Sequence, residues 1–343
     1  MKIIKEYITG GLKPKSINLY LFAAFITILS LIPVWTSDPT ILNVFIYTFL
    51  FAFYAASWSI LGKYAGQISI GHSVYFGLGA YTTVLLYVHY NVSPWLGMFV
   101  GGLLAAMVAM LLGLPCFRLR GLFYIFATLA FAEVVRIIFL HPLRDLSGGA
   151  EGIPFTIGYT SPYYFQFVEK WPYYYIALTM MILLIAGLQK MEKSRLGYYL
   201  KAICEDEDAA EAIGINVLKY KLIAAGISGF LTAIAGTFYV QFLCYIGVND
   251  VFGIMRSIEP VIISWVGGSG VFGPILGSFI ITPITEFLVL TLGMTTAYGL
   301  HMILYGAILI IIVLFMPEGV IKPLSQKFYI PLLKKLSEEY RRV

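Results

Sequence analysis

Ionisable residues are scarce inside the long apolar segments of this chain, and some of them come in pairs. Glu133 and Arg136 are three residues apart, and so are Arg256 and Glu259. Residues at this spacing share one face of a helix, so each pair can form an internal ion pair. An ionisable group within a membrane span is costly and is a functional candidate by default. We expect the Glu133–Arg136 pair mainly to fix helix packing, with a place in a transport path as the alternative, and we see no chain of groups for a proton relay.

The motifs of common catalytic chemistry are missing from the sequence. There is no GxxxxGK[ST] phosphate loop, no HExxH and no GxSxG, so nucleotide hydrolysis through a phosphate loop is excluded. The four histidines have no metal-ligand spacing, and the three cysteines lie far apart. We therefore expect no enzyme activity, no metal and no cofactor bound by this chain, although an intramembrane enzyme is not excluded.

The composition is that of a membrane protein. The chain has 343 residues, of which 59% are hydrophobic and 12% are charged, whereas soluble domains have roughly 45–50% apolar and about 25% charged residues. So few charges cannot cover a water-exposed surface of this size. The sequence thus excludes a typical soluble enzyme and a disordered chain, and it predicts an all-helical, multi-pass membrane protein that forms a single transmembrane domain over 1–343.

Charge-free stretches mark the spans, because a crossing helix needs about 20 apolar residues. The 54 residues between Lys63 and Arg118 are too many for one helix and predict a turn near 90–94. One span is expected between Lys15 and Asp38 and a second between Asp38 and Lys63. Further spans are expected at 121–140, at 171–189 and within 221–250, with about three more between 257 and 317. The total is about ten. Five glycines between 62 and 79 crowd one predicted span, and a second cluster follows residue 266.

Basic residues set the orientation. With the N-terminus inside and ten crossings, 19 Lys and Arg residues lie inside and three outside, namely Arg144, Lys170 and Arg256. Both termini are therefore predicted to be cytoplasmic, with 141–170 as an extracytoplasmic loop. The net charge of +5 reflects this asymmetry and gives no reason to expect a nucleic-acid partner.

Residues 190–221 form the charged loop of the predicted inner face. Bases come first, then the acidic run 205–211, then a stretch of helix formers that stops at Gly214. Asp206 can cap the free amides of a short helix at 206–213, and Gly214 suits the left-handed position after it. Ala209, Ala212 and Ile213 make a narrow apolar stripe. A helix this short is marginal alone, so we expect it to dock on a partner or on the ends of the chain's own helices.

These residues resemble a known family, the permeases of ABC importers for branched-chain amino acids of the LivM type. The resemblance spans about residues 40–320. It is carried by Ser194–Gly197 and Lys201–Asn216 in the charged loop, Ala65–His72 with Phe76–Thr82, Phe117–Gly121 with Thr128–Glu133 and Arg136, Ser147–Ile153, and Gly267–Gly270 with Gly273, Pro274 and Gly277.

The resemblance implies an ABC importer permease with a short cytoplasmic coupling helix in the inner membrane. Its partners would be a second homologous permease subunit, two cytoplasmic ABC ATPase subunits that use ATP and Mg²⁺, and an extracytoplasmic solute-binding protein. The residues expected to couple to the ATPase are Glu205, Asp206, Asp208, Ala209, Glu211, Ala212, Ile213 and Gly214. The candidates for the transport path or for helix packing are Gln67, His72, Glu133, Arg136 and Glu259.

Alternating access driven by separate ATPases is the mechanism that the resemblance implies. A permease for urea or short-chain amides is the alternative within this class. A membrane-embedded oxidoreductase subunit would need paired histidines or a buried acid–base chain, which are missing, and a secondary carrier is the third alternative. The exact solute, and whether the permease partner is identical or a paralogue, cannot be read from the sequence.

Overall fold

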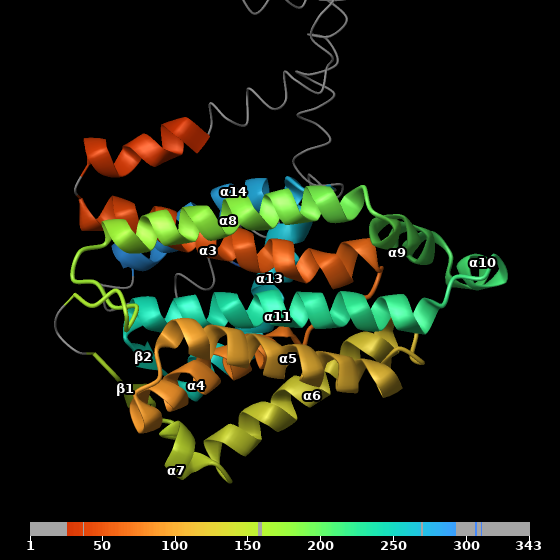
Figure 1. Cartoon of the computed structure of the whole chain (residues 1–343), viewed down its shortest axis with the longest axis horizontal. Coiled ribbons are helices and arrows are strands. Elements are labelled where there is room, and N and C mark those ends of the chain that lie inside the picture. The colour runs from red at the N-terminus through yellow and green to blue at the C-terminus, as the bar shows by residue number, and fades with distance from the viewer. Residues whose placement is uncertain are drawn as a thin grey trace, which may run out of the picture.

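The computed structural model describes residues 26–36, 38–156, 160–268 and 270–292, together with Gly306 and Ile310. An apolar helix, Ile26–Trp35, comes first. The labelled elements in chain order are α3 Pro39–Ser59, the π-helix η1 Ile60–Tyr64, α4 His72–Tyr90, α5 Pro94–Cys116, α6 Leu122–Leu140, α7 Arg144–Ser147, β1 Ile153–Pro154, α8 Trp171–Glu192, α9 Arg195–Glu205, α10 Glu207–Ala212, α11 Val217–Leu243, β2 Tyr245–Ile246, α12 Val248–Phe252, α13 Ile254–Gly267 and α14 Gly273–Leu292. The expected helical class is confirmed (Figure 1).

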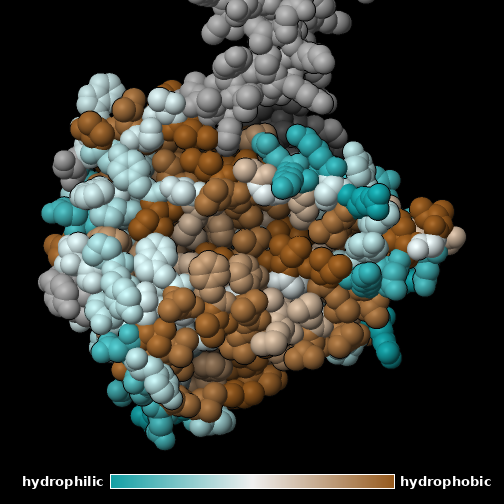
Figure 2. All heavy atoms as spheres, in the orientation of Figure 1, coloured by the Kyte–Doolittle hydropathy of each residue, from teal (hydrophilic) through white to brown (hydrophobic). Residues whose placement is uncertain are grey.

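Five helices of the described residues are long and apolar enough to cross a membrane: α3 with η1, α5, α6, α8 and α11. An apolar band crosses the middle of the molecule and polar residues gather at both ends (Figure 2). The turn predicted near 90–94 is present, because α4 ends at Tyr90 and α5 begins at Pro94. Most of 293–317 lies outside the described residues, so the total of ten spans stays a prediction.

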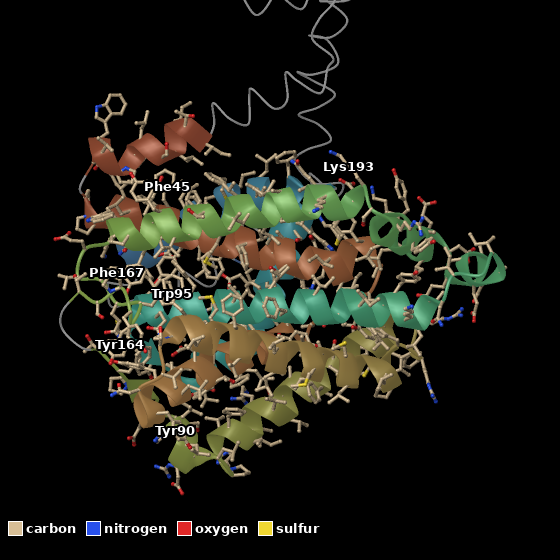
Figure 3. All side chains as sticks on the ribbon, viewed as in Figure 1. Phe45, Tyr90, Trp95, Tyr164, Phe167 and Lys193 are labelled. Carbon is tan, nitrogen blue, oxygen red and sulfur yellow. The ribbon has the colours of Figure 1, made fainter. Side chains whose placement is uncertain are left out.

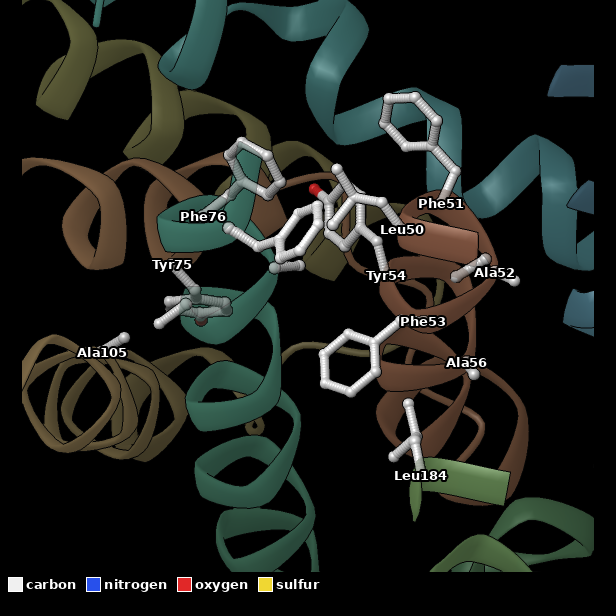
Figure 4. Packing of buried hydrophobic residues seen from close by; sticks show 14 of the residues in the cluster. Leu50, Phe51, Ala52, Phe53, Tyr54, Ala56, Tyr75, Phe76, Ala105 and Leu184 are labelled. Carbon is white, nitrogen blue, oxygen red and sulfur yellow. The ribbon is translucent and has the colours of Figure 1, made fainter. Parts of the chain in front are cut away.

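The core is built on α3 and α11. Helix α11 packs against α3, α4 and α5, while α3 also contacts α8, α13 and α14. Aromatic and aliphatic side chains of α3, such as Leu50 and Tyr54, meet Phe76 of α4 in this core (Figure 4). Over the most apolar 18-residue segment of each helix, 83% is buried in α3 with η1 but only 17% in α6. Helix α3 is thus a central element, and α6 presents most of its surface to the membrane or to another chain.

A break in helical structure separates η1 from α4 at residues 65–71. Its backbone is satisfied inside the protein: the Trp58 indole donates to the Ser69 carbonyl at 2.9 Å, and the Ile70 amide donates to Thr128 Oγ1 at 3.1 Å. Such irregular backbone is tolerated at membrane depth where protein surrounds it. The prediction that the glycines of 62–79 crowd one span is therefore wrong, because Gly66, with φ +70°, lies in the break.

The two loops predicted on opposite sides lie at opposite ends of the helix bundle. Helices α9 and α10 stand at one end, and α7, β1 and β2 at the other (Figure 1). Strands β1 and β2 pair antiparallel, with Ile153 opposite Ile246. The end that carries the strands also holds the labelled aromatic residues Trp95, Tyr164 and Phe167, whereas Lys193 lies toward the other end (Figure 3). Aromatic residues favour the membrane–water interface.

One sequence expectation is corrected and another is extended. Helix α11 begins at Val217, so Lys219 and Lys221 belong to the helix and not to the preceding loop. The count of bases placed Arg256 on the outer side with Arg144 and Lys170, but it did not show that this arginine is enclosed by the helix bundle. Arg256 belongs to α13, and its guanidinium lies 4.4 Å from the centre of the Tyr239 ring and 5.4 Å from that of Phe76. A positive charge over aromatic faces is stabilised there, so burial of this arginine is compensated by the protein.

Close approach of α4 and α11 depends on Gly79. A Cβ at this position would overlap the backbone carbonyl of Ala233, whereas a Cβ at Gly187 of α8 would meet nothing within 4 Å. Overfilled packing costs about 1–3 kcal/mol or more. We predict that Gly79→Leu sharply lowers the thermal unfolding temperature of the purified protein in detergent, while Gly187→Leu leaves it unchanged. Equal unfolding temperatures for the two variants would refute this account of the helix crossing.

Candidate functional site

The short helix predicted in the charged loop is present as α10. Asp206 is its N-cap, and its carboxylate accepts a hydrogen bond from the Ala209 amide at 2.9 Å. Gly214 follows the helix with φ +89°. The preceding helix α9 starts at its own cap, Ser194, whose hydroxyl accepts from the Gly197 amide. The sequence therefore fixes both ends of α10 through local hydrogen bonds.

Glu207 attaches α10 to the membrane domain at two points. Its Oε1 lies 2.5 Å from Nζ of Lys221 in α11 and accepts a hydrogen bond from Nε2 of Gln67 at 3.0 Å. Lys221 is only 1% exposed, so this ion pair is sheltered from water and is screened little. One carboxylate thus joins the short helix, the start of α11 and the break between η1 and α4.

Asp208 attaches α10 to the loop between α5 and α6. Arg120 donates two hydrogen bonds to its carboxylate, at 2.7 and 3.1 Å. The hydrogen bond and the positive charge of Arg120 lower the pKa of Asp208, and the same hydrogen bond raises the pKa of Arg120. Both side chains are exposed, and exposed pairs contribute little to stability. The bidentate geometry orients the helix more than it stabilises it.

The remaining residues of the predicted coupling set are all exposed. Ala210 is the buried residue of α10, and the predicted stripe points away from the protein, with Ile213 76% exposed. The other exposed members are Glu205, Ala209, Glu211, Ala212 and Gly214. Within the described residues, the stripe is therefore not used to pack α10 on the chain's own helix ends.

His72 has a structural position at the start of α4. Its ring is fully buried, with Nε2 2.9 Å from Ser228 Oγ of α11 and Nδ1 3.2 Å from Ser69 Oγ. Ser228 in turn donates to the Ser57 carbonyl of α3 at 2.8 Å. These bonds place His72 among helix-packing groups. Gln67, by contrast, reaches the short helix through Glu207, a contact that sequence reasoning did not predict.

Lys63 joins the end of α3 and η1 to the end of α13. Its ammonium donates to the carbonyls of Ser264, at 2.5 Å, and of Gly268. A cation at a helix C-terminus satisfies carbonyls that have no partner within the helix. Cys204 Sγ of α9 also contacts the Lys63 carbonyl at 3.3 Å. The predicted site did not include Lys63, Glu207 or Lys221. The signal for Lys63 is a base within an otherwise apolar stretch.

Glu133 and Arg136 form the predicted ion pair. Arg136 Nε and Nη2 donate to the two carboxylate oxygens at 3.0 and 2.5 Å, and Nη1 donates to Asn249 Oδ1 of α12 at 2.8 Å. The side chains are 46% exposed for Glu133 and 26% for Arg136. The pair is therefore not enclosed within this chain.

Arg256 and Glu259 form the second predicted pair, with Nη1 and Oε2 2.8 Å apart. Arg256 also donates to the Tyr239 hydroxyl at 2.9 Å and to the Asp250 carbonyl at 3.1 Å. This pair is more enclosed than the first, with side chains 15% and 25% exposed. Its contacts link α13 to α11 and α12, and they place Glu259 with helix packing.

Comparison with known proteins shows which family the sequence resembles. The family described as "Branched-chain amino acid transport system / permease component" matches residues 40–313. The chain is 26% identical over 281 residues to the high-affinity branched-chain amino acid transport system permease protein LivM of Escherichia coli K12, which covers 75% of this chain and 64% of that protein. LivM of Salmonella typhimurium is 26% identical over 280 residues, with the same shares covered.

A third relative, the autoinducer 2 import system permease protein LsrC of Photorhabdus luminescens, is 31% identical over 120 residues, which are 34% of this chain and 36% of that protein. The chain spans about 64% of the length of the two LivM proteins. No solved structure matches. The family match covers most of the chain, and the apolar helices are those of a multi-pass membrane protein. The chain therefore belongs to the family described as "Branched-chain amino acid transport system / permease component".

Proposed function

We propose that this chain is a transmembrane subunit of an ATP-driven ABC importer for branched-chain amino acids. The observation that carries the proposal is the construction of α10. One side of this capped helix is bonded to the membrane domain through Glu207 and Asp208, and the other side exposes a narrow apolar stripe. A helix of six residues held in this way suits transmission of force from a partner. The names of the LivM relatives support the solute class.

The complex that we propose contains this chain, a second homologous permease, two cytoplasmic ATPase subunits and a solute-binding protein outside. The inner membrane holds about ten spans of this chain, with both termini cytoplasmic. The excess of bases on the predicted inner side supports this orientation, and so do the opposite positions of α10 and the 141–170 loop (Figure 1). ATP and Mg²⁺ are bound by the ATPase subunits.

The attachments of α10 suggest how force would enter the membrane. A shift of α10 acts on three places at once: α11 through Lys221, the 65–71 break through Gln67, and the α5–α6 loop through Arg120. We expect the 65–71 break to bend more easily than the helices on either side of it, because it lacks the regular hydrogen bonds of a helix. Movement at the break would tilt α3 relative to α4, and Lys63 would carry it to α13. Alternating access follows from such tilts.

Uptake by the reconstituted complex tests the solute class. Proteoliposomes with this chain, its ATPase and permease partners and the loaded binding protein should accumulate leucine, isoleucine or valine when ATP is supplied inside. Urea or a short amide should not be accumulated. Uptake of urea without uptake of branched-chain amino acids would reject the proposal in favour of the alternative permease class.

The proposed orientation predicts a labelling pattern. In a variant whose native cysteines are replaced by alanine, Val168→Cys should react with a membrane-impermeant maleimide added to intact cells, whereas Ile213→Cys should not. Both side chains are well exposed, at 67% and 76%, so access depends on the side of the membrane. Ser325 lies outside the described residues and offers a second inner position. External labelling of Ile213→Cys would reverse the proposed topology.

The exposed stripe predicts a specific loss of coupling. Ala212→Trp should leave expression normal, because α10 lies outside the bilayer, but should weaken ATPase capture and abolish uptake by overfilling a close contact. Glu205→Lys is the milder control, since an exposed charge contributes under about 1 kcal/mol. The measurements are pull-down of the ATPase subunit and solute uptake in the same cells. Normal uptake by Ala212→Trp would mean that force enters elsewhere.

Loss of Glu207 should destabilise the protein, because Lys221 would remain buried without its partner. Breaking a buried pair costs about 3–5 kcal/mol. We predict that Glu207→Gln lowers the thermal unfolding temperature in detergent, that the added change Lys221→Met restores much of it, and that the exposed neighbour variant Glu205→Gln behaves like the original protein. If Glu207→Gln and Glu205→Gln unfold at the same temperature, Glu207 is not the anchor of α10.

A further inference from the structure

We propose that Glu133, Arg136 and Asn249 bind the charged groups of the transported amino acid in the outer half of the membrane domain. Arg136 would hold the α-carboxylate, Glu133 the α-ammonium, and the Asn249 amide would add a polar contact. This inference rests on the proposed function, since it assigns the zwitterion of that solute class to named residues.

The first support is the exposure of the pair on an otherwise apolar helix. The neighbouring exposed residues of α6 are apolar, among them Phe126, Val134 and Ile137. Glu133 nevertheless keeps 46% of its side chain exposed. A charge that faces hydrocarbon is costly, so intramembrane charges face protein or a water-filled cavity. This face of α6 is therefore lined by a polar space or covered by another protein chain.

The second support is the depth and direction of Arg136. It lies four residues before the end of α6 at Leu140, which is about 6 Å along the helix axis. An arginine so near the interface would extend outward to water if it served only as an anchor. Arg136 instead turns back by one helical turn to Glu133. The group therefore lies near the end of α6 that faces the proposed outer side, at a level that a solute released outside would meet early.

The third support is the match between donors and ligand. A guanidinium binds a carboxylate through two parallel hydrogen bonds, and Arg136 already binds the carboxylate of Glu133 in this way. A zwitterion can replace that internal pair by two external pairs, one with each residue, so neither charge is left uncompensated. Helix α13, which contacts α6, exposes Ile254 and Met255, apolar surface that suits a branched aliphatic side chain.

A double substitution separates recognition from packing. Glu133→Gln with Arg136→Gln removes both charges and leaves none unpaired, so we expect this variant to assemble with its partners. Its ATP hydrolysis should still respond to the loaded binding protein, but the maximal rate of leucine uptake should fall by roughly tenfold or more, as expected for loss of charge-assisted hydrogen bonds. Arg144→Gln, an exposed change just beyond α6, is the matched control and should transport normally.

Arg136→Lys is a second test of the site, which can be used if the double variant fails to assemble. It keeps the positive charge beside Glu133 but loses the planar two-point contact with a carboxylate, so it should assemble and still transport slowly. Uptake at the original rate by either assembled variant would overturn the site and leave the proposed function intact. If the original complex transports no amino acid at all, the proposed function fails and the site fails with it.

Discussion

The need to satisfy every backbone polar group within the protein governs this structure, because hydrocarbon offers no hydrogen bonds. Regular helices meet that need by themselves, so the informative places are those where the helices stop. At the 65–71 break, Trp58, Thr128 and the backbone around Leu61 supply the missing partners. At the end of α13, the ammonium of Lys63 supplies them. Lys63 lies in η1, directly before the break, and so joins the start of this irregular segment to the end of α13.

The charged groups of the described residues differ by their surroundings more than by their chemistry. Arg256 is wrapped by aromatic rings and paired with Glu259, which makes it a fixed part of the packing. Lys221 is more deeply buried, yet its partner Glu207 belongs to a short helix outside the bundle. Glu133 and Arg136 are partly exposed on a helix whose other exposed residues nearby are apolar. Ion pairs of similar chemistry therefore form a packing contact within the bundle, a link between the bundle and a short helix, and a candidate solute contact.

The sequence predicts what depends on near neighbours. The caps Asp206 and Gly214, the turn before Pro94 and the two pairs at a spacing of three residues were all predictable, because each depends on contacts within a few residues. The contact of Gln67 with Glu207 joins positions 140 residues apart and leaves no periodic signal. The enclosure of Arg256 by Tyr239 and Phe76 was not predictable, because a count of bases does not show which of them are covered by protein. The glycine cluster was misread because glycine serves close helix packing and helix breaks equally well.

The bonds of Lys63 have a consequence for biosynthesis. Ser264 follows Lys63 by 201 residues, which a ribosome adds in roughly 10–40 s at about 5–20 residues per second. During that interval the lysine has no acceptor from α13. In the proposed orientation it stays hydrated at the inner surface, where its charge helps to hold the first hairpin in place. Only when α13 arrives does the ammonium leave water for the carbonyls. The residue that first acts as a topological signal therefore becomes a closing bond of the finished bundle, and a nascent chain cut short before Ser264 would lack that closure.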